Sequence, residues 1–82
     1  MSAYVLNKML RDINQKPEKR ERYFADPAKF AESYELDAEE RRAFLAYDIG
    51  ALYRLGAHGL ILRPFTLLKG VAEPDYLRAI RS

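Results

Sequence analysis

The 82-residue sequence predicts an all-α fold, a compact single-domain bundle of six or seven short helices that spans residues 1–82. Three observations lead to this prediction. Apolar residues recur at three- and four-residue spacing, as they do on one face of a helix. Prolines and acidic residues stand where helices would begin, and glycines stand where helices would end. Two-residue alternation of apolar and polar residues never lasts long enough to indicate a strand.

Four helices are predicted in the first half of the chain, over residues 3–15, 17–25, 27–34 and 38–47. Pro17 and Pro27 suit the first position of a helix, where no backbone amide donor is needed. Asp26 is a favoured N-cap residue, and Asp37 with Glu40 has the spacing of a capping box. The side chains expected to face the core are those of Leu6, Met9, Leu10, Ile13, Tyr23, Phe24, Phe30, Ala31, Tyr34, Phe44 and Leu45.

Three further helices are predicted, over residues 49–55, 59–69 and 74–80. Asp48 is the expected N-cap of the first of these, and Gly56 is its expected C-terminal stop. Pro64 lies within the second, so it either kinks that helix or marks its true start. Gly70 ends the second helix. The last helix places Tyr76, Leu77 and Ile80 on one apolar face.

The composition excludes several classes of function. The chain has no cysteine and one histidine, so it cannot build a thiolate site, a histidine-rich zinc site or a two-histidine iron site alone. Its 14 basic and 12 acidic residues interleave, and no basic stripe indicates nucleic-acid binding. No apolar run approaches the roughly 20 residues of a membrane span. No secretory signal or catalytic motif is present, so we expect a cytoplasmic binding domain without catalytic residues or bound metal.

His58 has two interpretations. It lies between Gly56 and Gly59, before the most apolar segment of the chain. In the functional interpretation, the turn presents His58 to a ligand or to a partner's active site. In the structural interpretation, His58 caps a helix or bonds to the backbone of the turn. The structural interpretation is the commoner one for such a residue.

The segment 60–68 is apolar on nearly all sides of its predicted helix. An ordinary surface helix needs only three or four apolar residues in two turns. This segment is therefore either a buried central helix or a helix that another protein covers. The residues alone leave both interpretations open.

Aromatic and basic residues elsewhere have ordinary structural explanations. Six tyrosines and four phenylalanines at helical spacing are typical of core packing and interface anchors, and less often of a ligand cage. The basic residues of the segment 16–22 alternate with Glu18 and Glu21, which is typical of a solvated helix face.

The order of several short motifs resembles the small (alpha) subunits of the protocatechuate 4,5-dioxygenase family, which are class III extradiol ring-cleavage enzymes. The resemblance runs from Tyr4 to Ile80. Its motifs are Asn7-Lys8-Met9-Leu10, Arg22-Tyr23-Phe24-Ala25-Asp26-Pro27, Tyr34-Glu35-Leu36, Glu39-Glu40, Tyr47-Asp48-Ile49-Gly50-Ala51-Leu52, Gly56-Ala57-His58 and Asp75-Tyr76-Leu77.

The resemblance implies a non-catalytic small subunit that caps and stabilises a large (beta) subunit. The large subunit of this family holds Fe(II) with two histidines and one glutamate, and cleaves a catechol ring with O2 in aromatic-compound catabolism. By position, the residues implied to form a lid near the substrate are His58, Gly59, Leu62 and Phe65. The residues implied to contact the partner are Leu60, Ile61, Arg63 and Leu67.

The chain departs from the larger members of this family in two places. It has no N-terminal extension before the first helix, and it passes directly from Leu68 to Pro74 where longer members insert a loop. Which catechol or aminocatechol is cleaved therefore stays open.

Two alternatives to the subunit role remain. The domain could be a recognition module that a modifying enzyme grips, as in precursor peptides, although those carry a core peptide after the domain. It could also be a plain helical adaptor. An isolated chain is expected to hide its apolar helix in a homodimer.

Overall fold

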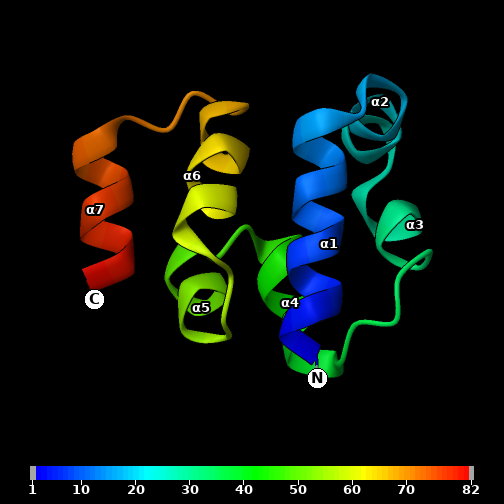
Figure 1. Ribbon diagram of the computed structural model, residues 1–82, viewed down its shortest axis with the longest axis horizontal. Coiled ribbons are helices and arrows are strands. Elements are labelled where there is room, and N and C mark those ends of the chain that lie inside the picture. Colours follow the sequence, from blue (N-terminus) through cyan, green and yellow to red (C-terminus); the bar gives the residue numbers. More distant parts are fainter. Residues whose placement is uncertain (1, 82) are drawn as a thin grey trace.

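Helices are the regular elements of the computed structural model, which describes residues 2–81 (Figure 1). Seven helices lie within these residues, and no strand does. They are α1 (Ser2–Gln15), α2 (Pro17–Ala25), α3 (Pro27–Ala31), α4 (Ala38–Ala46), α5 (Ile49–Arg54), α6 (Gly59–Leu67) and α7 (Glu73–Arg81). The predicted all-α class is confirmed. Met1 and Ser82, the ends of the predicted domain, lie outside the described residues.

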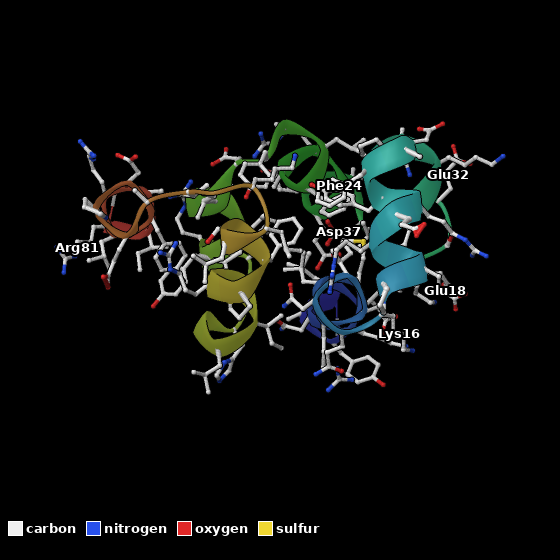
Figure 2. The ribbon with its side chains drawn as sticks, turned by 90° about the horizontal axis from the view of Figure 1, so that it is seen from above. Lys16, Glu18, Phe24, Glu32, Asp37 and Arg81 are labelled. Atoms are coloured by element: carbon white, nitrogen blue, oxygen red, sulfur yellow. The ribbon has the colours of Figure 1, made fainter. Side chains whose placement is uncertain are left out.

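The helices form two uneven layers. Figure 1 shows α1 and α6 side by side and running in the same direction, with α2 and α3 beyond α1 and α7 beyond α6. From above, the green segment that contains α4 and α5 lies behind α1 and α6 (Figure 2). The last helix packs mainly on α5. Consequently α1 and α6 make up one face of the molecule.

The core depends on α1 and on one aromatic cluster. The four predicted core residues of α1 are fully buried, and they are Leu6, Met9, Leu10 and Ile13. Tyr23 packs between Phe44 and Phe65, with ring centroids 5.2 and 5.7 Å away. Burial raises the pKa of Tyr23 to about 12. The Lys69 ammonium lies 4.3 Å from the ring centroid of Tyr47 and closes this cluster towards solvent.

Side-chain caps explain how such short helices form. The Asp26 carboxylate accepts a hydrogen bond of 3.2 Å from the backbone amide of Lys29 at the start of α3. The Asp37 carboxylate accepts one of 2.8 Å from the Glu40 amide, and the Glu40 side chain returns the bond, which completes a capping box. Asp48 caps α5 in the same way, at 3.1 Å. The predicted caps are confirmed, and each satisfies backbone donors that a helix start leaves unbonded.

Two predicted core residues are exposed instead. Phe24 is 49% exposed and Leu45 is 40% exposed. Each follows a fully turned-in aromatic neighbour, Tyr23 or Phe44, and successive residues on a helix point about 100° apart. Tyr23 and Phe44 fill the aromatic cluster, so the adjacent residue of each pair points outward. The prediction of a buried side chain was therefore wrong for Phe24 and Leu45.

Two predicted helix ends also differ from the structure. The helix that begins at Pro27 ends at Ala31, because the chain then tightens into bonds between residues three apart, such as Tyr34 N to Ala31 O at 3.1 Å. The helix predicted over 59–69 ends at Leu67 for the same reason. Pro64 lies within this helix, so it does not mark the helix start.

Asp12 is a buried carboxylate that ties three segments together. It is 4% exposed and accepts a 2.6 Å hydrogen bond from the Tyr34 hydroxyl. The ammonium groups of Lys8 and Lys16 lie 3.4 and 3.5 Å from its oxygens, and that of Lys19 lies at 3.9 Å. Burial by itself raises the pKa of Asp12, but the Tyr34 hydrogen bond and the lysines outweigh it, so the pKa lies below its ordinary value.

The last helix docks through a close backbone approach. A methyl group built on Gly50 of α5 would lie 2.6 Å from the Ala79 carbonyl oxygen of α7. The Arg63 guanidinium of α6 lies 4.9 Å from the ring centroid of Tyr76 and donates a 3.0 Å hydrogen bond to the Val71 carbonyl. These contacts hold α7, although it has few neighbours besides α5.

Replacing Asp12→Asn is expected to lower the free energy of unfolding at pH 7 by about 1–3 kcal/mol, because the lysines and Tyr34 lose a charged buried partner. The folded pKa of Asp12 lies below its unfolded value of 3.8. The carboxylate therefore stabilises the fold above pH 3.8, and this contribution disappears as the pH falls through the folded pKa. The difference in free energy of unfolding between the unsubstituted protein and Asp12→Asn should therefore narrow below pH 4. Urea unfolding at pH 7 and at pH 3 measures this difference.

The matched control is Asp75→Asn. Asp75 forms an exposed ion pair with Arg78 on α7. Such pairs contribute at most about 0.5 kcal/mol when they are three or four residues apart on a helix. A stability gap for Asp12→Asn that stays constant with pH would contradict the prediction.

Replacing Gly50→Ala is expected to loosen α7 and to lower the free energy of unfolding by about 1–3 kcal/mol, because the new methyl group overlaps a backbone carbonyl. Thermal unfolding measures the loss of stability, and limited proteolysis at residues 68–72 measures the loosening of α7. Gly59→Ala is the control, since nothing lies within 4 Å of a methyl group there. Equal effects of the two substitutions would show that the close approach is unimportant.

Candidate partner-binding site

Asn7 holds the turn before α6 in place. Its side-chain amide donates a 3.0 Å hydrogen bond to the Gly56 carbonyl, and its side-chain oxygen accepts a 2.7 Å bond from the His58 amide. Gly56 has a φ of 111°, a backbone conformation that side chains with a Cβ rarely adopt. A methyl group on Gly56 would also lie 3.0 Å from the Cβ of Ala3. The turn therefore has one defined shape, and it fixes where His58 lies.

His58 is the N-cap of α6. Its Nδ1 accepts a 3.1 Å hydrogen bond from the Leu60 amide, as the structural interpretation of this residue predicts. A neutral imidazole that accepts at Nδ1 carries its proton on Nε2. The His58 side chain is exposed, and the hydrogen bond that its side chain makes within residues 2–81 uses Nδ1, which leaves Nε2 to donate. Capping and contact with a partner are therefore compatible in this residue.

Two of the four residues implied to form a lid lie inside the chain's own core. Leu62 is fully buried, and Phe65 is 1% exposed against Tyr23 and Phe44. Both side chains belong to the inward face of α6 in this structure. Gly59 is half-buried and His58 is exposed. The surface part of the implied lid is therefore limited to these two residues.

The outer side of α6 carries three apolar side chains in a row, which we call the α6 ridge: Leu60, Pro64 and Leu67. Leu60 is 82% exposed and Leu67 is 54% exposed. Pro64 is exposed between them. Residues four and seven apart lie on the same side of a helix, so the three form one stripe. The segment 60–68 is therefore buried on one side of α6 and exposed on the other.

Ile61 and Arg63, the other residues implied to contact a partner, have bonds within this chain. The Ile61 carbonyl accepts a 2.9 Å hydrogen bond from the Asn14 side chain of α1, and Ile61 is half-buried. Arg63 donates to Val71 and to Thr66, and it lies over Tyr76. Arg63 therefore joins α6 to α7 in the structure.

Two tyrosines, one packed against Arg63 and one bonded to Asp12, have raised pKa values. Burial raises the pKa of Tyr76, although the Arg63 charge counters this. Burial also raises the pKa of Tyr34, and its hydrogen bond to Asp12 adds to the effect. Both tyrosines are therefore neutral donors or ring partners at neutral pH. Neither is placed for proton transfer with His58 by any hydrogen bond in the described residues.

Sequence reasoning missed two residues near the site. Asn7 entered the sequence analysis only as part of a motif, yet it holds the turn that carries His58. An asparagine within a helix has low helix propensity, and that signal could have marked it. Tyr4 is 69% exposed on α1, and no pattern in the sequence distinguished it from a core residue.

Other features of the described residues give no second site. A hollow of about 840 Å³ lies along α7, lined by Glu73, Pro74, Leu77, Arg78 and Arg81, and it includes no residue of α6. Between Ser2 and Arg81, no three histidine, cysteine or carboxylate side chains gather closely enough to hold a metal ion. In the same part of the chain, no helix has the length and apolar character needed to cross a membrane.

Comparison with protein families identifies the chain. Residues 6–81 match the family described as "Aromatic-ring-opening dioxygenase LigAB, LigA subunit". The chain belongs to this LigA family. The match begins within α1 and covers the other six helices. The resemblance stated from the motifs is thereby confirmed. Searches of curated proteins and of solved structures find no match.

Membership of the LigA family makes this chain similar to small subunits of LigAB dioxygenases. It also implies a partner, the catalytic LigB subunit. The iron of such an enzyme does not fit the residues of this chain, which has one histidine and no metal-binding group in the described part.

Proposed function

We propose that this LigA-family chain is the non-catalytic small subunit of an Fe(II)-dependent extradiol catechol dioxygenase. It binds the LigB subunit, covers its active site and stabilises it, in a cytoplasmic enzyme of aromatic-compound catabolism. The match over residues 6–81 carries this proposal. The ring-cleaving chemistry belongs to the partner, since no residue of this chain is assigned to catalysis.

The α6 ridge is the proposed contact with LigB. Covering a fully exposed leucine contributes about 1.5–3 kcal/mol, and Leu60 is 82% exposed. Leu67 adds a second apolar anchor two helical turns away. Leu62 and Phe65 support the ridge from inside, because they fix α6 against the aromatic cluster. A rigid helix with a protruding apolar side suits an interface better than a flexible loop does.

His58 and Gly59 are the proposed lid. They stand at the start of α6, beside Leu60, so a partner that covers Leu60 lies close to both. His58 Nε2 then donates one hydrogen bond to a polar substituent of the substrate. A lid of this kind also excludes water from the pocket, which strengthens the polar interactions inside it.

Replacing Leu60→Glu is expected to weaken binding of the LigB subunit by at least about 30-fold, because an apolar anchor becomes a charge. The melting temperature of the free chain should stay within about 2 °C, since Leu60 packs on little of its own fold. Calorimetry with the LigB subunit from the same genome measures the affinity.

Leu45→Glu is the matched control for this experiment. Leu45 is a comparable exposed leucine, at 40%, and it lies on α4 in the other layer. Binding by this variant should be unchanged. Equal losses for Leu45 and Leu60, or no loss for Leu60, would remove the α6 ridge from the proposed interface.

Replacing His58→Asn is expected to preserve the cap of α6 and to remove the imidazole Nε2, because asparagine is a strong N-cap residue. The reconstituted enzyme should then show a KM for its catechol raised about 5- to 20-fold at unchanged subunit affinity, as expected for one lost hydrogen bond. His58→Ala loses the cap as well and should unfold more easily by about 0.5–2 kcal/mol. Unchanged kinetic constants for both variants would show that His58 does not touch the substrate.

A further inference from the structure

The outward side of α1 adjoins the α6 ridge. Asn7 and Asn14 bond to residues of the turn and of α6, so their side of α1 faces α6. Leu6 and Ile13 mark the side that faces the core. Tyr4 and Arg11 are seven residues apart, so they lie on the same side of α1. That side is next to the Asn7 side and points away from the core. Tyr4 is 69% exposed.

Tyr4, Arg11 and the α6 ridge therefore lie on one side of the molecule, which we call the α1–α6 face. In Figure 1 the two helices stand in front of α4 and α5, and Figure 2 shows the same separation from above. The face is apolar along α6 and mixed aromatic and basic along α1.

The α1–α6 face has no exposed carboxylate. The one acidic residue of α1 is Asp12, which is 4% exposed beneath Lys8, Lys16 and Lys19. The segment 49–72, which includes all of α6, contains no aspartate or glutamate. The three lysines are paired with the Asp12 carboxylate on the side of α1 that faces α2 and Tyr34. Arg11 is therefore the exposed charge on the outward side of α1 that no carboxylate of α1 or α6 offsets.

Acidic residues gather elsewhere in the chain. The segment 32–48 carries six carboxylates and two arginines. The carboxylates are those of Glu32, Glu35, Asp37, Glu39, Glu40 and Asp48. The net charge of +2 thus conceals an uneven distribution, because the segment 32–48 alone is negative while the rest of the chain is positive.

We propose that the α1–α6 face docks on an apolar patch of the LigB subunit that is rimmed by acidic side chains. This inference rests on the proposed function and adds the face and the charge of the contact. The apolar ridge fills the centre of the contact, and Arg11 lies at its rim. Opposite charges at the rim of an interface act mainly by steering the two proteins together. The association rate and its salt dependence are therefore the properties that test this proposal.

A second copy of this chain is a poorer occupant of the same face. A two-fold symmetric contact places the same patch on both sides. Arg11 would then approach Arg11 of the second copy, and no carboxylate of α1 or α6 is exposed to pair with it.

The test compares association rates of Arg11→Glu and Arg22→Glu with the LigB subunit of the same genome, by stopped-flow mixing at about 50 and 300 mM salt. Both arginines are exposed on helices, and both substitutions change the charge equally. Arg22 lines a hollow between α2 and α3, away from the α1–α6 face. We expect Arg11→Glu to slow association about 3- to 10-fold at low salt and Arg22→Glu to slow it less than twofold, with the difference lost at high salt.

The outcomes separate this inference from the proposed function. If the complex forms but both variants associate equally, or if Arg11→Glu associates faster, the charge complementarity is wrong and the subunit role stands. If no complex forms with the LigB subunit, the proposed function itself fails. Arg11-dependent binding to duplex DNA or to phosphatidylserine vesicles, or a dimer of the free chain that Leu60→Glu dissociates, would assign the face to another occupant and overturn the inference.

Discussion

The parallel packing of α1 against α6 is the constraint on which the rest of the structure depends. Four fully buried side chains of α1 supply much of the core of a chain that is small for stable folding. Asn7 and Asn14 bond to the turn and to the backbone of α6, so the register between the two helices is fixed by polar bonds. The aromatic cluster around Phe65 packs against the inner side of α6. Because α6 is apolar on nearly all sides, its outer side is left with the exposed α6 ridge. The inner side of α6 therefore belongs to the core, and its outer side is the one proposed for binding.

Buried polar groups give this small fold its specificity. Asp12 joins α1 to the turn after α3 through Tyr34, and the lysines around it leave it ionised. Glu40 is fully buried, and its Oε1 accepts the Asp37 amide in the capping box, while its Oε2 is buried without a hydrogen-bond partner among the described residues. Such groups are costly to bury unless they are bonded, so each one excludes alternative packings in which its partner is absent. The same arrangement leaves α1 without an exposed carboxylate, so Arg11 stands without an acidic neighbour on its outward side.

Much of the site could be anticipated from the sequence, although not its division between core and surface. The apolar excess of residues 60–68 was visible, and so was the turn position of His58. The sequence did not reveal that Leu62 and Phe65 face inward while Leu60 and Leu67 face outward, because a helix that is apolar all round has no pattern that marks its inner side. Arg63 was unpredictable for a similar reason, since its partners Val71 and Tyr76 meet it only after α7 has docked.

The sequence by itself determined the all-α class, the caps at Asp26, Asp37 and Asp48, and the family, because these depend on local backbone chemistry and on the order of short motifs. The single histidine also means that a two-histidine iron site cannot form from one copy of this chain. Tertiary structure decided which of Tyr23 and Phe24 turns inward, and which carboxylates reach the surface. Those outcomes depend on competition among side chains from distant segments for one core, and local spacing carries no information about that competition.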